Sequence, residues 1–191
     1  MVLAKKTFCL LLFLSLSSNL IFAQSEPRGL VVYYSRTGTT KKVAEELAGK
    51  FGADIERLID KRKRTGPVGY MRASKDAVAK NLTDLEPIEK NPHDYDIIII
   101  GTPSWYGNMT PAVRTFLDQN GLEKKTIAVF GTTNLTGIEN ACKQVAETVA
   151  GKDFEQVPVL PLRKRDLKRE VLSEKIDEFY NAAIDKYRAK K

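Results

Sequence analysis

Hydroxyl side chains gather around one glycine between residues 35 and 40, in the order Ser-Arg-Thr-Gly-Thr-Thr. The apolar and aromatic run before them, residues 30–34, is typical of a strand. After this segment, apolar residues recur at helical spacing from residue 43 onward. A loop between a strand and a helix offers backbone N–H groups and the positive helix end to an anion. The pattern predicts a phosphate site, and its candidate residues are Ser35, Arg36, Thr37, Gly38, Thr39 and Thr40.

Two later loops carry groups of other kinds. The four isoleucines at 97–100 predict a strand buried on both faces, and the chain's only tryptophan follows them. A further strand, near 126–130, leads into a threonine-rich loop. In a doubly wound sheet these loops meet at one edge, where ligands bind. Their side chains suit a flat, aromatic, phosphorylated ligand, and the candidates are Pro103, Ser104, Trp105, Tyr106, Gly107 and Asn108 in the second loop and Thr132, Thr133, Asn134 and Thr136 in the third.

Strand and helix signals alternate along the rest of the chain, which favours an α/β sheet with right-handed crossovers. Strands are expected near 29–35, 54–59, 95–101, 126–130 and 154–160, and helices near 40–51, 68–81, 111–120, 138–150 and 166–188. In the second of these helices, Met71, Ala77 and Val78 are expected to face inward. Without a repeat or a linker, the pattern indicates one domain over residues 28–190.

The first 23 residues have the order of a secretory signal peptide: two lysines, an apolar run, and a small residue at Ala23. We expect an exported protein, periplasmic or secreted. The alternative is an uncleaved membrane anchor. Cleavage would lower the net charge from +7 to +5, since it removes two lysines and no acid. It would also leave Cys142 as the sole cysteine, which predicts a core residue rather than a disulfide.

The first motif resembles the flavodoxin signature at Tyr33, Ser35, Gly38, Thr40 and Leu47. The loop at 101–108 looks like the flavodoxin-like loop over one flavin face, and the third loop like that on the other side. The resemblance implies a flavodoxin-like, doubly wound three-layer sandwich with a five-stranded parallel sheet, order 2-1-3-4-5. It also implies noncovalent FMN. Residues 35–40 would hold its phosphate and residues 103–108 its ring, with Gly107 as a peptide able to turn its carbonyl toward the flavin.

Competing chemistries lack their residues. A Walker loop needs a glycine ahead of Gly-Lys-Ser/Thr, and none is present. The only histidine, His93, lies outside the three loops, so no nucleophile–histidine pair supports hydrolysis. We expect no catalytic side chain, no metal site and no nucleic-acid partner.

Three functions stay open at this stage. The first is an FMN oxidoreductase that takes electrons or hydride from NAD(P)H or a redox protein and passes them to a quinone, a small oxidant or a protein. The second is a non-enzymatic electron carrier, and the third is an FMN-free binding module. The basic residues Lys61, Arg62, Lys63 and Arg64 are interpreted as a solvated loop or as a contact with a membrane surface or other anionic partner.

Overall fold

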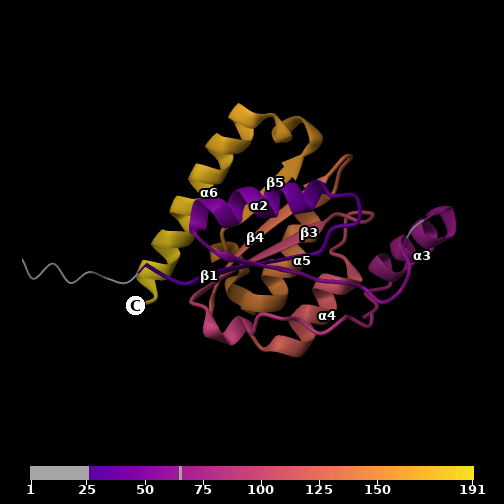
Figure 1. Ribbon diagram of the computed structural model, residues 1–191, viewed down its shortest axis with the longest axis horizontal. Helices are drawn as coiled ribbons and strands as arrows, with labels where there is room; N and C mark the ends of the chain where they lie inside the picture. Colours follow the sequence, from indigo (N-terminus) through magenta and orange to yellow (C-terminus); the bar gives the residue numbers. More distant parts are fainter. Residues whose placement is uncertain (1–25, 65) are drawn as a thin grey trace, which may run out of the picture.

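Parallel strands form the centre of the protein (Figure 1). The computed structural model describes residues 26–64 and 66–191. Within these residues, one sheet contains β1 (Gly29–Tyr33), β2 (Asp54–Arg57), β3 (Ile97–Pro103), β4 (Thr126–Thr133) and β5 (Val159–Arg163). Their order is β2-β1-β3-β4-β5, and all neighbouring strands pair in parallel. This confirms the predicted fold class and strand order.

Helices cover both faces of the sheet. One face carries α2 (Thr39–Phe51) and α6 (Arg169–Ala189), and the other carries α4 (Pro111–Asn120) and α5 (Ile138–Ala150). Short 3-10 turns lie at η1 (Pro92–Asp94), η2 (Gly151–Gln156) and η3 (Lys164–Leu167). The remaining helix, α3 (Gly66–Val78), projects from one end of the molecule, away from these layers (Figure 1).

The isoleucines of β3 divide between the two layers. Ile98 and Ile100 join the apolar cluster under α4 and α5, while Ile97 and Ile99 join that under α2 and α6. All four side chains are fully buried. Each buried isoleucine stabilises the fold by about 1.5–3 kcal/mol. The central strand therefore holds both helix layers, as the uninterrupted apolar run predicts.

Most expected elements differ from the structure by a few residues at their ends, and two differ in more than their bounds. The fifth strand begins at Val159 rather than 154, because residues 151–156 form η2 instead. In α3, Ala77 is buried as predicted, but Met71 and Val78 are 70% and 57% exposed. Their predicted inward orientation is wrong, because α3 lies at the end of the molecule and buries mainly its alanines.

The basic loop before α3 also differs from a solvated run. Lys61, Arg62 and Lys63 are exposed, but Arg64 is buried between two aspartates. If this loop contacts an anionic surface, the contact must therefore be made by Lys61, Arg62 and Lys63.

The predicted signal peptide lies outside the described residues. The described chain begins beside the amino end of β1, where the backbone N–H of Arg28 donates to the Asp96 carboxylate at 2.9 Å. Among the helices the structure describes, none combines the length and apolar character needed to cross a membrane.

Candidate functional site

A cavity lies at the carboxyl edge of the sheet, where the loops after β1, β3 and β4 meet. It is lined by Arg36, Thr37, Thr39, Thr40, Ser74, Pro103, Ser104, Trp105, Thr132, Thr133, Asn134 and Leu135. The three predicted loops therefore form one site. Of the described residues that line it, Arg36 alone carries a charge, so the cavity favours an anion.

The first loop shapes the start of α2. The Ser35 hydroxyl accepts a hydrogen bond from the Gly38 N–H at 3.1 Å, and Gly38 has a φ of 91°, which favours glycine. No side chain caps the N-terminus of α2, and its first turn carries no acidic residue. The first N–H groups of a helix have no partner within it, and Thr39 and Thr40 in the first turn of α2 line the cavity. Ser35 and Gly38 thus set the backbone of the site rather than line it.

One hydrogen bond joins the first loop to the third. The hydroxyl oxygens of Thr40 and Thr132 lie 2.9 Å apart, and both residues are buried. In the third loop the Thr133 hydroxyl accepts from the Leu135 N–H at 3.2 Å. Thr133 and Asn134 line the cavity, whereas Thr136 is exposed and lies outside it.

The second loop contains a tight two-residue turn. Trp105 and Asn108 exchange backbone hydrogen bonds of 3.0 and 3.1 Å, and Tyr106 and Gly107 between them have φ of 51° and 76°. Positive φ at both central residues is typical of a type I′ turn. A left-handed conformation at a bulky residue such as Tyr106 is uncommon and costs about 1–2 kcal/mol. Tyr106 is 67% exposed and does not line the cavity.

Helix α5 holds this turn from outside. The side-chain amide of Asn140 donates to the Gly107 carbonyl at 2.7 Å, and that of Gln144 donates to the Asn108 side-chain oxygen at 2.7 Å. Sequence reasoning missed both residues. Their spacing of four places them on one face of a helix, but nothing in the sequence indicates which loop that face meets.

Trp105 lies between two partners. Its ring is 7% exposed, it meets the Tyr34 ring edge-on at 5.5 Å, and the Arg36 guanidinium lies 5.6 Å from its centre. The pKa of Tyr34 is raised to about 12, chiefly by burial and then by the Asp60 carboxylate. The cation–π contact between Arg36 and Trp105 connects the first loop to the second across the cavity.

Two lining residues fall outside the predicted set. Leu135 lies within the third loop and is 77% exposed. Ser74 comes from α3, which no loop-based reasoning includes. The remaining chemistry-bearing residues lie elsewhere: His93 is in η1, and Cys142 is buried in α5, where burial raises the pKa of its thiol.

The fold and the cavity define a class: a flavodoxin-like α/β protein with an anion-favouring site at the carboxyl edge of its sheet. The flavodoxin family model matches residues 28–176, so the chain belongs to the flavodoxin family. The structure resembles a flavoprotein of Lactobacillus acidophilus solved with FMN, at 23% identity and a TM-score of 0.58, covering 81% of this chain and 99% of that one.

Two further solved structures share the fold. A Bacteroides uniformis protein assigned as a flavoprotein is 23% identical with a TM-score of 0.65, over 79% of this chain and 98% of that one. Oxidised flavodoxin 2 of Bacillus cereus is 18% identical with a TM-score of 0.53, over 83% and 99%.

Proposed function

We propose that this protein binds FMN noncovalently in the three-loop cavity and is an exported oxidoreductase. The observation that carries the proposal is the cavity itself, which combines an uncapped helix N-terminus, hydroxyl side chains and the only tryptophan of the chain. The family match and the FMN-bound Lactobacillus neighbour support this choice of ligand.

The residues present fit FMN. A phosphate dianion requires N–H donors and positive potential, which the start of α2 supplies. Thr37, Thr39 and Thr40 line this end and can donate from their hydroxyls. Trp105, Pro103 and Ser104 line the cavity where a flat ring would lie.

The flavin supplies the redox chemistry, taking up and releasing electrons or hydride. The protein's own side chains bind and orient it. No acid or base is needed at a side chain, and the strongly perturbed groups nearby, such as the Tyr34 hydroxyl, are buried in the core. The electron donor is either NAD(P)H or a redox protein, and the acceptor is a quinone, a small oxidant or a protein.

A second function, a non-enzymatic electron carrier, shares the same cavity. The α3 residue in the cavity wall favours the enzyme, because a helix beside the ring would shape a pocket for a second reactant. Export rests on residues 1–23 alone, and a retained membrane anchor is its alternative.

Binding is tested by titrating the purified full chain with FMN and with riboflavin, following flavin fluorescence. We expect riboflavin to bind about 100-fold more weakly, since it lacks the phosphate whose charged hydrogen bonds contribute about 1.5–3 kcal/mol each. Thr40→Val should weaken FMN binding while leaving riboflavin nearly unchanged. A protein that binds neither flavin would overturn the proposal.

Enzyme and carrier are then separated by anaerobic mixing of the FMN-loaded protein with NADH and NADPH. Bleaching of the flavin by either indicates an enzyme. No bleaching, combined with rapid electron exchange with a partner redox protein, indicates a carrier.

A further inference from the structure

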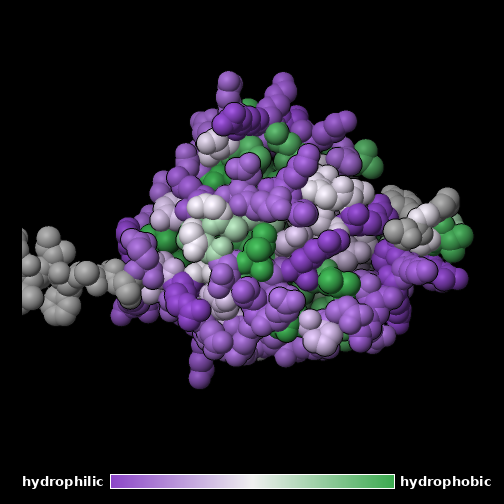
Figure 2. Space-filling view, viewed as in Figure 1, coloured by the Kyte–Doolittle hydropathy of each residue, from purple (hydrophilic) through white to green (hydrophobic). Residues whose placement is uncertain are grey.

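Helix α3 has little apolar surface to hold it in place. Of its described side chains, only those of Ala73 and Ala77 are buried, and Val68 and Met71 are 58% and 70% exposed. Figure 2 shows hydrophobic atoms at this projecting end of an otherwise largely hydrophilic surface. Two alanines bury far less area than a helix of 13 residues usually does. The position of α3 therefore depends on other contacts.

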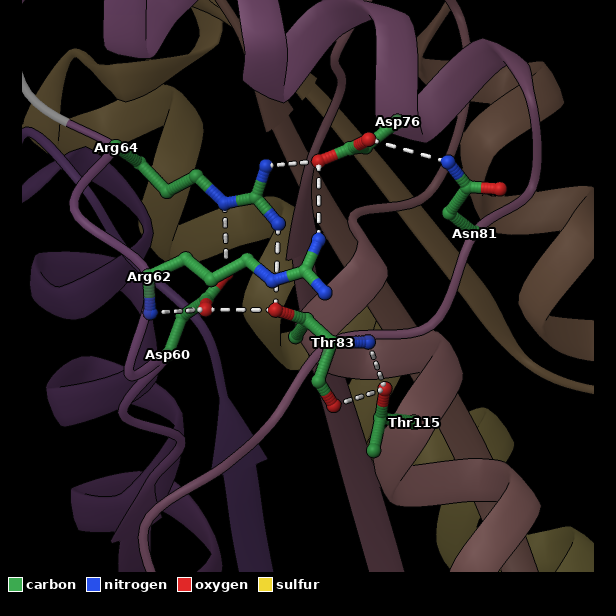
Figure 3. Close-up of polar contacts among 7 residues, drawn as sticks. All are labelled: Asp60, Arg62, Arg64, Asp76, Asn81, Thr83 and Thr115. Atoms are coloured by element: carbon green, nitrogen blue, oxygen red, sulfur yellow. Dashed lines mark hydrogen bonds and ion pairs between the residues drawn. The ribbon is translucent and has the colours of Figure 1, made fainter.

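A buried ion cluster supplies those contacts (Figure 3). The Arg64 guanidinium donates to Asp60 from Nε at 2.8 Å, to Asp76 from Nη1, and to the Thr83 hydroxyl from Nη2 at 3.3 Å. The side chains of Arg64, Asp60 and Asp76 are 4%, 2% and 17% exposed. Because Asp76 belongs to α3 while Asp60 and Thr83 do not, Arg64 connects the helix to the body of the protein.

The cluster is closed by further hydrogen bonds. The Thr83 hydroxyl donates to Asp60 at 2.8 Å, and the Thr83 N–H donates to the hydroxyl of Thr115 in α4 at 2.9 Å. Burial lowers the pKa of Arg64, but its bonds to Asp76 and Asp60 outweigh burial and raise it. Because the guanidinium has three hydrogen-bond partners, its position is fixed, and its contact with Asp76 fixes the position of α3.

The cluster reaches the cavity by two routes. Asp76 follows Ser74 by two residues on α3, and Ser74 lines the cavity. Burial and then the Asp60 carboxylate raise the pKa of Tyr34, whose ring packs edge-on against Trp105 at 5.5 Å. Ala73, beside Ser74, belongs to the same apolar cluster as Tyr34 and Trp105. The cluster is thus linked to two residues that line the cavity: to Ser74 through α3, and to Trp105 through Tyr34.

We propose that the Asp60–Arg64–Asp76 cluster is a positioning device that holds α3 against the flavin cavity, so that α3 forms part of the wall past which the second reactant reaches the flavin. This inference rests on the proposed function.

The helix-holding part is tested without flavin. In Asp76→Ala, Arg64 keeps Asp60 and Thr83, so no buried cation loses all its partners, and alanine preserves helix propensity. We expect amide hydrogen exchange across α3 to rise at least tenfold while that of β3 is unchanged, with Asp76→Asn intermediate. The exposed neighbour Lys63→Ala is the matched control and should change neither. Unchanged exchange in α3 of Asp76→Ala would overturn the proposal.

The selection part uses the reduced, FMN-loaded protein reoxidised by menadione or by ferricyanide. Asp76→Ala should raise the menadione concentration for half-maximal rate at least fivefold, and Lys63→Ala should not change it. The maximal rate, the ferricyanide rate and the FMN dissociation constant should stay within twofold. Unchanged menadione saturation in Asp76→Ala would overturn the role of the cluster in placing α3 beside the second reactant. If FMN fails to bind, the proposed function is wrong, while the hydrogen-exchange result still decides whether the cluster positions α3.

Discussion

The two ends of the cavity are held by different kinds of contact. At the first, Ser35, Gly38 and Thr40 fix the start of α2 through hydrogen bonds within six residues and one bond to Thr132. At the second, the turn at residues 105–108 depends on α5, and α3 depends on a buried ion cluster. Apart from the Thr40–Thr132 bond, the first end is built by local backbone geometry, whereas the second is built by contacts between elements distant in sequence.

This difference separates affinity from selectivity. The local end offers donors suited to any phosphate, so it should determine how tightly the cofactor is held. The distant contacts shape the space beside the ring, so they should determine what reacts with it. Substitutions at the two ends should therefore change different measurements.

The largest effect is expected from Gly38→Val. A β-branched residue at a φ of 91° is strained, and FMN affinity should fall about 5- to 150-fold, as about 1–3 kcal/mol of strain implies. Gly52→Val is the matched control, because Gly52 ends the same helix with a φ of 56° and also faces open space. It should lower stability without changing affinity. Equal loss of affinity in both variants would contradict the distinction between the two ends.

Gly137→Ala should act on the second end. A Cβ at Gly137 would lie 2.6 Å from the Gly107 Cα, so the turn must move, and Trp105 beside it should report the movement. We expect a shifted tryptophan emission maximum and a loss of stability of about 2 kcal/mol from overpacking. Gly121→Ala, also at positive φ but with its nearest atom at 3.6 Å, should lose less stability and leave the emission unchanged.

Acid should loosen α3. Burial raises the pKa of Asp76, but hydrogen bonds from Arg64 and Asn81 outweigh it, so the pKa lies below its ordinary value of 3.8. The contribution of Asp76, about 1.5 kcal/mol, is complete above that ordinary value and is lost as the pH falls through the lower folded value. Urea unfolding of the wild type and Asp76→Ala should therefore differ equally at pH 7 and 5, and less at pH 3. A difference that does not shrink would contradict the assigned ion pair.

The smallest effect is expected from Tyr106→Asn. Asparagine tolerates positive φ and, with Gly107, forms the preferred pair of a type I′ turn. We expect a gain of about 1 kcal/mol and a rise in Tm of about 2–4 °C by calorimetry. Leu135→Asn, which replaces another exposed apolar residue, should give no comparable gain.

The sheet and the local end of the site were predictable because their signals are local. Four isoleucines in a row at 97–100 place the central strand, and a hydroxyl loop before a helical pattern indicates the anion site. Both signals come from residues adjacent in sequence, so they can be recognised without knowing the tertiary structure.

The part of the site formed by α3 could not be predicted, because it depends on contacts between elements that the spacing of residues in the sequence does not reveal. Ser74 reaches the cavity from a helix whose direction is set by Arg64, 10 positions earlier, and that arginine appeared as one of four basic residues in a loop. Met71 was expected inside because apolar residues usually are, whereas α3 presents it to solvent. Periodicity indicates that a helix has an apolar side but not whether another element covers it.

The position of the amino end relative to the cavity has a mechanical consequence. The described chain begins at one edge of the sheet, beside Arg28 and Asp96, while the cavity lies at the opposite edge, about 17 Å away along β1. If the predicted segment at residues 1–23 were retained as a membrane anchor, the cavity would lie on the side of the domain away from the bilayer. A donor embedded in that bilayer could then reduce the flavin only through a diffusible electron carrier, or if the whole domain reoriented on its N-terminal segment.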